Sequence, residues 1–198
     1  MSYKKKDNIR GKTGMVTRRS LMTTIASTAS FLVAAPVLSK APGFLRGAGD
    51  IRKIRFRNFN TGEFINSVYW IEGSYVDGAL GEIDYFMRDW RQNKERPYDP
   101  ANIDILSATQ GLLDSSEPFY LLSGYRTRKT NKMLSRMTDG VAQNSYHVKA
   151  MAADIRMRTR STDKISKAAK SFKSGGVGRY ARSGFVHIDS GPFRTWTS

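Results

Sequence analysis

Two histidines and one aspartate are the residues of this chain whose types and spacing could carry out chemistry. The 198-residue sequence contains two histidines, His147 and His187. His147 lies in the segment 145–154, which ends at Asp154, and His187 lies in the segment 185–189. Two imidazoles and a carboxylate are a ligand set of catalytic zinc, with water in the open fourth position. Together they predict a hydrolytic zinc site, although a single histidine in an apolar stretch is more often packed or exposed than bound to metal.

Two strands and a loop must bring these three side chains together. Residues 152–157 alternate small or apolar with polar side chains, and residues 185–189 do the same, which is typical of β-strands. Asp154 is therefore expected on one strand and His187 on a neighbouring one. His147 is expected to reach in from the loop seven residues before Asp154.

Four motifs surround these residues. The first is Ser145-x-His147-x-x-small-x-Ala-x-Asp154, followed by the apolar strand that carries His187. The others are Ser123-Gly-Tyr-Arg126, Gly175-Gly-Val-Gly178-x-Tyr180 and His187-Ile-Asp-Ser-Gly-Pro192. In these motifs the chain, over roughly residues 51–198, resembles the zinc D-Ala-D-Ala carboxypeptidase and murein endopeptidase family. It is most similar to the periplasmic branch that is exported by the twin-arginine pathway.

The resemblance implies a hedgehog/D,D-peptidase fold, a Zn²⁺ ion held by His147, Asp154 and His187, and hydrolysis of peptide bonds in peptidoglycan. It also implies that Arg126 binds near the substrate peptide, where a guanidinium suits a carboxylate. The alternative for Arg126 is an ordinary surface charge. The predicted substrate is thus a peptidoglycan peptide, either a cross-link or a stem peptide, and the bond that is cut stays open.

The chain departs from the family in two places. Members often have Glu, Asp or His two or three residues before the last ligand, where this chain has Gly184 and Phe185. The nearest carboxylate is Asp189, which shares a strand face with His187 because residues i and i+2 point the same way. Asp189 is therefore predicted to be the catalytic base, or alternatively to hold a ligand by a hydrogen bond. The second departure is Ala150, where the family usually has glycine.

Residues 1–49 have the layout of an export signal and linker, and residues 50–198 are expected to form the zinc peptidase-like domain. Five basic residues among the first twelve precede the pair Arg18-Arg19, and a moderately apolar run covers residues 21–38. A basic region followed by an apolar one is typical of such signals. We therefore expect a periplasmic protein that uses the twin-arginine export machinery. The alternatives are an uncleaved anchor, which would be the chain's one membrane contact, or an apolar N-terminal helix.

Charge and composition limit the kinds of partner and of metal site that this chain can have. The net charge is +16, and from residue 50 onward 24 Lys and Arg face 16 Asp and Glu, which leaves +8. A basic surface suits nucleic acid, anionic lipid or an anionic wall polymer. The chain has no recognisable nucleic-acid-binding module, so no nucleic-acid partner is expected. It also has no cysteine, which excludes disulfides and a thiolate zinc site.

The hydrophobic pattern predicts an α+β domain with a mainly antiparallel sheet, helices on one side and the metal in a cleft on the other. A hairpin over residues 51–71 should bury its apolar face and expose its arginines. Further elements are expected at 79–92 (helix), after the N-cap Asp99 (helix), at 118–124 (strand), 127–137 (helix) and 161–172 (helix). Residues 175–178 are expected to form a flexible turn and residues 192–198 a short tail.

Three functions remain open at this point. The favoured one is a zinc peptidase of the cell wall. The second is the same domain with its metal but without turnover, acting as a wall- or partner-binding module, because the acid before the last ligand is missing. The third, a nucleic-acid-binding protein, rests on charge alone.

Overall fold

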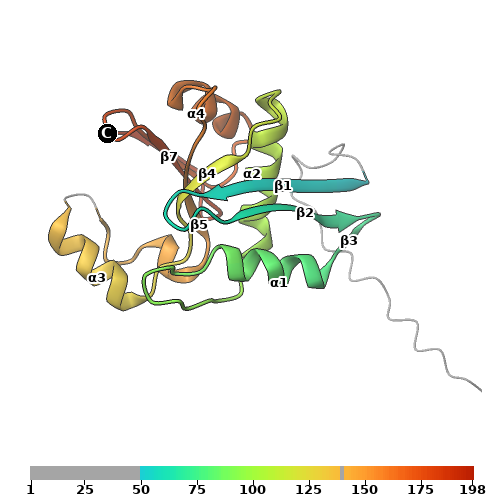
Figure 1. Cartoon of the computed structure of the whole chain (residues 1–198). Coiled ribbons are helices and arrows are strands. Elements are labelled where there is room, and N and C mark those ends of the chain that lie inside the picture. Colours follow the sequence, from blue (N-terminus) through green and yellow to red (C-terminus); the bar gives the residue numbers. More distant parts are fainter. Residues whose placement is uncertain (1–49, 139–140) are drawn as a thin grey trace, which may run out of the picture. The chain divides into compact units, whose positions relative to one another are not determined.

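An eight-stranded mixed sheet is the centre of the computed structural model, which describes residues 50–138 and 141–198 (Figure 1). The strands are β1 (Ile51–Asn58), β2 (Phe64–Ile71), β3 (Ser74–Tyr75), β4 (Phe119–Ser123), β5 (Ala152–Arg156), β6 (Gly176–Tyr180), β7 (Phe185–Asp189) and β8 (Arg194–Thr197). The helices are α1 (Asp77–Phe86), α2 (Pro100–Leu112), α3 (Arg128–Met137), α4 (Thr162–Ser171) and the 3-10 helix η2 (Tyr146–Lys149). The predicted export signal, residues 1–49, lies outside the described residues. Within these described ranges, no helix combines the length and the apolar character needed to cross a bilayer.

The sheet is mainly antiparallel, as predicted. Its strand order is β3-β2-β1-β4-β5-β7-β6-β8. The pairs β1 with β4 and β6 with β8 are parallel, and the other neighbouring pairs are antiparallel. The predicted α+β class is confirmed, and the arrangement is consistent with a hedgehog/D,D-peptidase-like fold.

One face of the sheet carries the hydrophobic core, and the predicted ligands project from the other. Strand partners on the core face are Phe56 with Phe119, Leu121 with Ile155, Ile155 with Val186, and Ile188 with Val177. These residues share one buried cluster with Ile83 of α1, Leu106 of α2 and Ile165 of α4. Because side chains alternate along a strand, Asp154 and His187 point away from this cluster.

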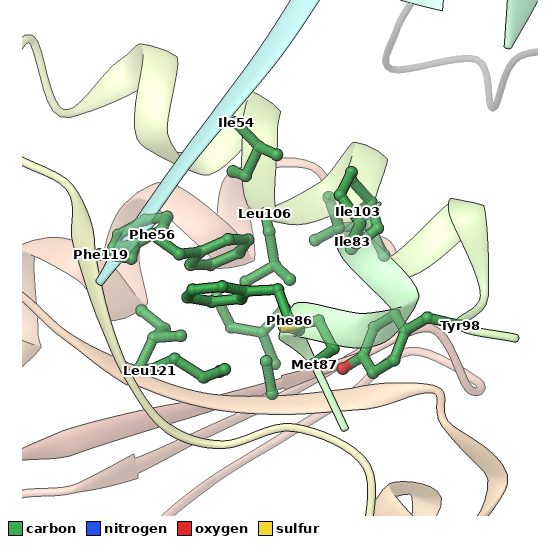
Figure 2. Packing of buried hydrophobic residues seen from close by; sticks show 14 of the residues in the cluster. Ile54, Phe56, Ile83, Phe86, Met87, Tyr98, Ile103, Leu106, Phe119 and Leu121 are labelled. Carbon is green, nitrogen blue, oxygen red and sulfur yellow. The ribbon is translucent and has the colours of Figure 1, made fainter. Parts of the chain in front are cut away.

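Aromatic rings fill the core between the sheet and α1 (Figure 2). The rings of Phe56 and Phe86 stack with centroids 5.9 Å apart, and Phe56 also packs against Phe119 at 6.2 Å. Full burial of one such side chain stabilises the fold by about 1.5–3 kcal/mol. This packing fixes the chain after α1, where the backbone oxygen of buried Met87 accepts a hydrogen bond from the Tyr125 N–H at 2.7 Å.

Three helices begin directly after a side-chain cap, and the cap at Asp99 was predicted. The Asp99 side chain accepts a hydrogen bond from the Ala101 N–H at the start of α2, with Pro100 in the first turn. Thr127 caps α3, and Ser161 caps α4. Helix α1 is shorter than the predicted range 79–92, because it ends at Phe86 and the chain then turns through a bridge between Asp89 and Lys94.

The prediction that the arginines of the hairpin are exposed is wrong for Arg52. Arg52 shares a strand face with buried Ile54 and Phe56, and only 7% of its surface is exposed. Its Nη1 donates to the Asp104 Oδ1 of α2 at 3.1 Å, which places a carboxylate opposite the buried guanidinium. Period-two patterning cannot reveal this partner, because Asp104 lies 52 residues away on another element.

Two strands replace the predicted glycine turn and C-terminal tail. Residues 176–180 form β6, and residues 194–197 form β8, which pairs with β6 in parallel. The glycines are needed for close packing: a Cβ on Gly178 would meet the indole of Trp196, and one on Gly176 would meet the Asp189 carboxylate. Glycine inside a strand often marks such a close approach. The prediction of a flexible turn was wrong, because these glycines lie in a paired strand.

Candidate metal centre

His147, Asp154 and His187 converge on one point. Asp154 Oδ1 lies 2.9 Å from His187 Nδ1 and 3.2 Å from His147 Nε2. The two ring nitrogens, His147 Nε2 and His187 Nδ1, are 3.2 Å apart. Ligand atoms about 2.0–2.1 Å from a tetrahedral zinc ion lie about 3.4 Å from one another. The donor types and their spacing therefore fit zinc.

Strand register brings two of the three ligands together. Asp154 on β5 and His187 on β7 are direct antiparallel partners, so their side chains leave the same face of the sheet at adjacent positions. Neighbouring strands lie about 4.8 Å apart. The Asp154 and His187 side chains therefore need to lean only slightly toward each other to bring their ligand atoms together.

The third ligand comes from the 3-10 helix η2, which Ser145 caps by accepting a hydrogen bond from the His147 N–H. The His147 ring is buried, and its Nδ1 lies 2.7 Å from the Gly124 carbonyl oxygen. Helix η2 ends at Ala150 in the left-handed region, with φ 58°. This conformation explains why glycine suits the position, since an L-residue pays about 1–2 kcal/mol there.

Hydrogen bonds at the far side of each imidazole fix its tautomer. His147 Nδ1–H donates to the Gly124 oxygen, which leaves Nε2 with a free lone pair toward the cluster. His187 Nε2 lies 2.9 Å from Asp189 Oδ2, and its Nδ1 faces Asp154. Such outer partners orient metal-binding histidines and raise their basicity.

Asp189 lies behind His187, on the far side of the ring from Asp154. It is fully buried, and its two oxygens accept hydrogen bonds from the Gly176 and Gly191 N–H groups and from both Nη atoms of Arg194. The distance from Arg194 Nη2 to Asp189 Oδ2 is 2.7 Å. With these donors and His187 around it, Asp189 has little remaining capacity to accept a proton from the cleft.

The electrostatics favour a charged Asp154 carboxylate beside a neutral His147 and a protonated His187. Burial lowers the pKa of His147 to about 4, and Arg126 adds to this against the opposing charge of Asp154. Burial would raise the pKa of Asp154, but the charges and hydrogen bonds of His147 and His187 outweigh it and hold that pKa well below its usual range. Burial also opposes protonation of His187, yet its bonds to Asp154 and Asp189 raise its pKa to about 9.

Arg126 reaches the same site from the segment after β4. Its backbone N–H donates to the His147 carbonyl oxygen at 3.1 Å, and its Nη2 lies 3.4 Å from Asp154 Oδ2. The side chain is buried, and its Nε has no hydrogen-bond partner within the described ranges. Arg126 thus lies beside the metal ligands with donor capacity to spare.

A cavity of about 640 Å³ opens in front of the three ligands. Its lining includes Arg126, Tyr146, Tyr180, Phe185, Arg194 and Trp196. The rings of Tyr180 and Phe185 stack at 4.4 Å, and Trp196 Nε1–H donates to the Tyr180 oxygen at 3.2 Å. Tyr180 thus faces the cleft.

Sequence reasoning missed Arg194 and Trp196, because residues 192–198 were predicted to be a tail. Both side chains line the cavity, and the Trp196 ring lies 5.4 Å from the His187 ring. The signal was present as two large side chains at period two after Pro192. This pattern could be recognised as a strand only once its pairing with β6 was known.

Comparison with known proteins gives a consistent result. Residues 46–196 match the family described as peptidoglycan L,D-endopeptidase MepK. The chain is 42% identical over 145 residues to the peptidoglycan L,D-endopeptidase MepK of Escherichia coli K12, covering 73% of this chain and 80% of that protein. It is 37% identical over 148 residues to the probable peptidoglycan L,D-endopeptidase MepK of Haemophilus influenzae, covering 73% and 78% respectively.

No solved structure matches the chain. The sequence match spans most of the described domain, including all three converging ligands. The chain therefore belongs to the peptidoglycan L,D-endopeptidase MepK family.

Proposed function

We propose that this chain is a zinc-dependent L,D-endopeptidase of peptidoglycan. The observation that carries the zinc assignment is the convergence of His147, Asp154 and His187 within 4.8 Å of one another at the floor of a cleft. The family match supports the peptidoglycan substrate and the endopeptidase reaction. Zinc bound by such a ligand set supplies a Lewis acid for a peptide carbonyl and lowers the pKa of water.

The remaining residues of the site bind the substrate or orient the metal ligands. Arg126 is positioned to bind a carboxylate or carbonyl oxygen of the substrate peptide next to the metal ligands, with the two-pronged geometry of a guanidinium. Asp189 keeps His187 in the tautomer that presents Nδ1, and Arg194 holds Asp189 in turn. Asp189 is thus proposed as a positioning residue, and the sequence-based alternative is a general base.

Metal removal tests the enzymatic assignment. Protein treated with chelator should release no shorter muropeptides from purified sacculi, and one equivalent of zinc should restore release. The variant His147→Ala should lose both stoichiometric zinc and activity, because it removes one of three ligands. A Lys164→Ala variant on exposed α4 serves as control. Unchanged sacculi under saturating zinc would overturn the enzymatic assignment.

A catalytically silent wall-binding module is the second candidate. It is favoured by the absence of a carboxylate other than Asp154 from the described lining of the cleft. Co-sedimentation of zinc-loaded protein with sacculi, without any new muropeptide, would support this candidate.

We also propose that residues 1–49 direct export by the twin-arginine pathway to the periplasm. The support is the pair Arg18-Arg19 before an apolar run, together with a substrate that lies outside the cytoplasm. A variant in which both arginines are replaced by lysine should accumulate in the cytoplasm on cell fractionation. Periplasmic accumulation of that variant would contradict the proposal.

A further inference from the structure

The face of the sheet that carries the metal ligands continues beyond the cleft toward β1. Asp154 and Arg156 are two residues apart on β5 and share that face. Arg156 is the strand partner of Tyr120 on β4, and Tyr120 is the partner of Arg57 on β1. Strands β5, β4 and β1 are adjacent in the sheet (Figure 1), so these side chains form a row leading away from the ligands.

Arginines and aromatic rings are interleaved in this row. The Arg156 guanidinium lies over the Phe59 ring, with its Cζ 4.2 Å from the centroid. The Arg158 guanidinium lies over the Tyr120 ring at 4.7 Å. We call Arg57, Phe59, Tyr120, Arg156 and Arg158 the arginine–aromatic face. Stacking holds a guanidinium flat on its ring and leaves its N–H groups directed outward.

The arginines of this face are available to an anionic partner. Within the described ranges, no ion pair involves Arg156 or Arg158. The oxygens of Glu117 accept hydrogen bonds from the Arg158 and Thr159 N–H groups, and the charge of Arg158 helps to lower the Glu117 pKa. Phe59 is 54% exposed. In contrast, Arg126 and Arg194 of the cleft both contact aspartates.

The dimensions of the face fit a peptide. Two residues along a strand span about 6.6 Å and two strand spacings about 9.6 Å, so the face extends about 10–15 Å from the ligands. An extended peptide covers that distance with about three to five residues. Free carboxylates on such a peptide could pair with the guanidinium groups in a bidentate manner.

We infer that the arginine–aromatic face binds acidic peptide chains of the peptidoglycan polymer that lie outside the bond being cut. The inference rests on the proposed function, since it takes the cleft as the place where the scissile peptide lies. Continuity of the face with the cleft, and its positive charge, support this occupant over an unrelated partner. The face would thus distinguish the polymer from a small fragment that fills the cleft alone.

The test compares polymer with fragment. The double variant Arg156→Gln/Arg158→Gln removes both stacked guanidinium groups, and Lys164→Gln/Lys167→Gln removes two exposed charges of α4 as a control for charge alone. We expect the first variant to bind sacculi about tenfold more weakly in co-sedimentation, which is the loss of roughly one charge-assisted contact. Zinc-loaded protein at 4 °C, in incubations too short for turnover, keeps binding separate from cleavage.

Rates give an independent readout. The Arg156→Gln/Arg158→Gln variant should lose about tenfold in rate on sacculi and keep kcat/KM within about twofold on a soluble cross-linked muropeptide dimer. Equal losses on both substrates, equal losses in the α4 control, or unchanged sacculus binding would overturn the inference. So would loss of binding to phosphatidylglycerol vesicles with unchanged binding to sacculi. If wild type cleaves neither substrate while the binding difference persists, the proposed function fails and the inferred surface stands.

Discussion

At the scale of single residues, the site is defined by which side of each imidazole carries a proton. Gly124 and Asp189 hold the outer N–H groups of His147 and His187. The inner nitrogens of both rings are thereby directed at one point next to the Asp154 carboxylate, where a bound metal ion would replace the proton that His187 Nδ1 directs at Asp154. This pattern favours Asp189 as an orienting group, and it leads to a test that separates orientation from proton transfer.

Replacing Asp189 by asparagine should raise the zinc dissociation constant by about 10- to 100-fold, because a neutral amide no longer fixes the His187 tautomer. At saturating zinc, activity on muropeptides should largely recover. Zinc affinity by competition with a chelating dye and rates at several zinc concentrations provide the measurement. Asp163→Asn on α4 is the matched control. Activity that stays lost at full zinc occupancy would instead identify Asp189 as the base.

The convergence of His147, Asp154 and His187 could be predicted from sequence because their types are rare in this chain and their spacing is informative. His147 and His187 are its two histidines. Arg194 could not be found in the same way, because its role depends on its contact with Asp189, five residues away around a turn. Its importance arises from geometry that no local pattern encodes.

At the scale of elements, a buried carboxylate holds the start of helix α3. Asp89 Oδ2 accepts hydrogen bonds from the Thr127 N–H and hydroxyl at 2.9 Å each, directly after Arg126. Asp89 is only 2% exposed. Burial would raise its pKa, but the hydrogen bonds from Thr130, Thr127 and Arg91 outweigh burial and lower it.

The variant Asp89→Asn should therefore be less stable than wild type by about 1–3 kcal/mol at neutral pH, since a charge-assisted interaction is lost. Because the folded-state pKa is depressed, this contribution is present above the unfolded pKa of about 3.9 and is lost as the pH falls. Thermal melts should show the gap between the two proteins narrowing progressively as the pH falls below about 5. A gap that does not vary with pH would contradict this account.

The elements that sequence patterns predicted correctly are those with local signals. Caps at Asp99, Thr127 and Ser161 mark helix starts. Strands β6 and β8 were missed because β6 contains Gly176 and Gly178 in place of strand-forming residues. Glycine is required at these two positions because the side chains of Asp189 and Trp196 pack onto the backbone there. This requirement is visible only once the strands are paired.

At the scale of the whole molecule, a buried polar cluster joins the first hairpin to α2. Asp104 is fully buried and accepts hydrogen bonds from Arg52, Tyr69 and Tyr75 at 2.7–3.1 Å. The cluster lies on the helix side of the sheet, remote in sequence from the metal ligands. It therefore bears on stability, and the cleft should not depend on its charge.

Replacing Asp104 by leucine should destabilise the fold by about 3–5 kcal/mol, because Arg52 would keep a buried charge without a partner. The double variant Arg52→Met/Asp104→Leu should recover much of that loss, since both charges are removed together. Urea unfolding measures both values. Under conditions in which both variants are fully folded, their zinc affinity should equal that of wild type. Equal destabilisation of the single and double variants would show that the unpaired charge of Arg52 is not responsible.

The predictions of a murein peptidase family and of a peptidoglycan peptidase function are confirmed by the family match. The domain boundary at residue 50 and the export route stay predictions, because they depend on residues 1–49. Sequence patterns could predict the class of sheet and the side that carries the ligands. They could not predict the strand order, which depends on pairings such as β1 with β4, whose partner residues are 63 positions apart.

The direct pairing of Asp154 with His187 has one more consequence. A slip of β7 by a single residue would rotate every side chain of that strand to the opposite surface and offer Val186 or Ile188 where a nitrogen donor is required. Under the proposed zinc assignment, retention of the ion would therefore report correct alignment of β5 and β7. Partially refolded chains, sorted by bound zinc, should separate cleanly into aligned and misaligned populations.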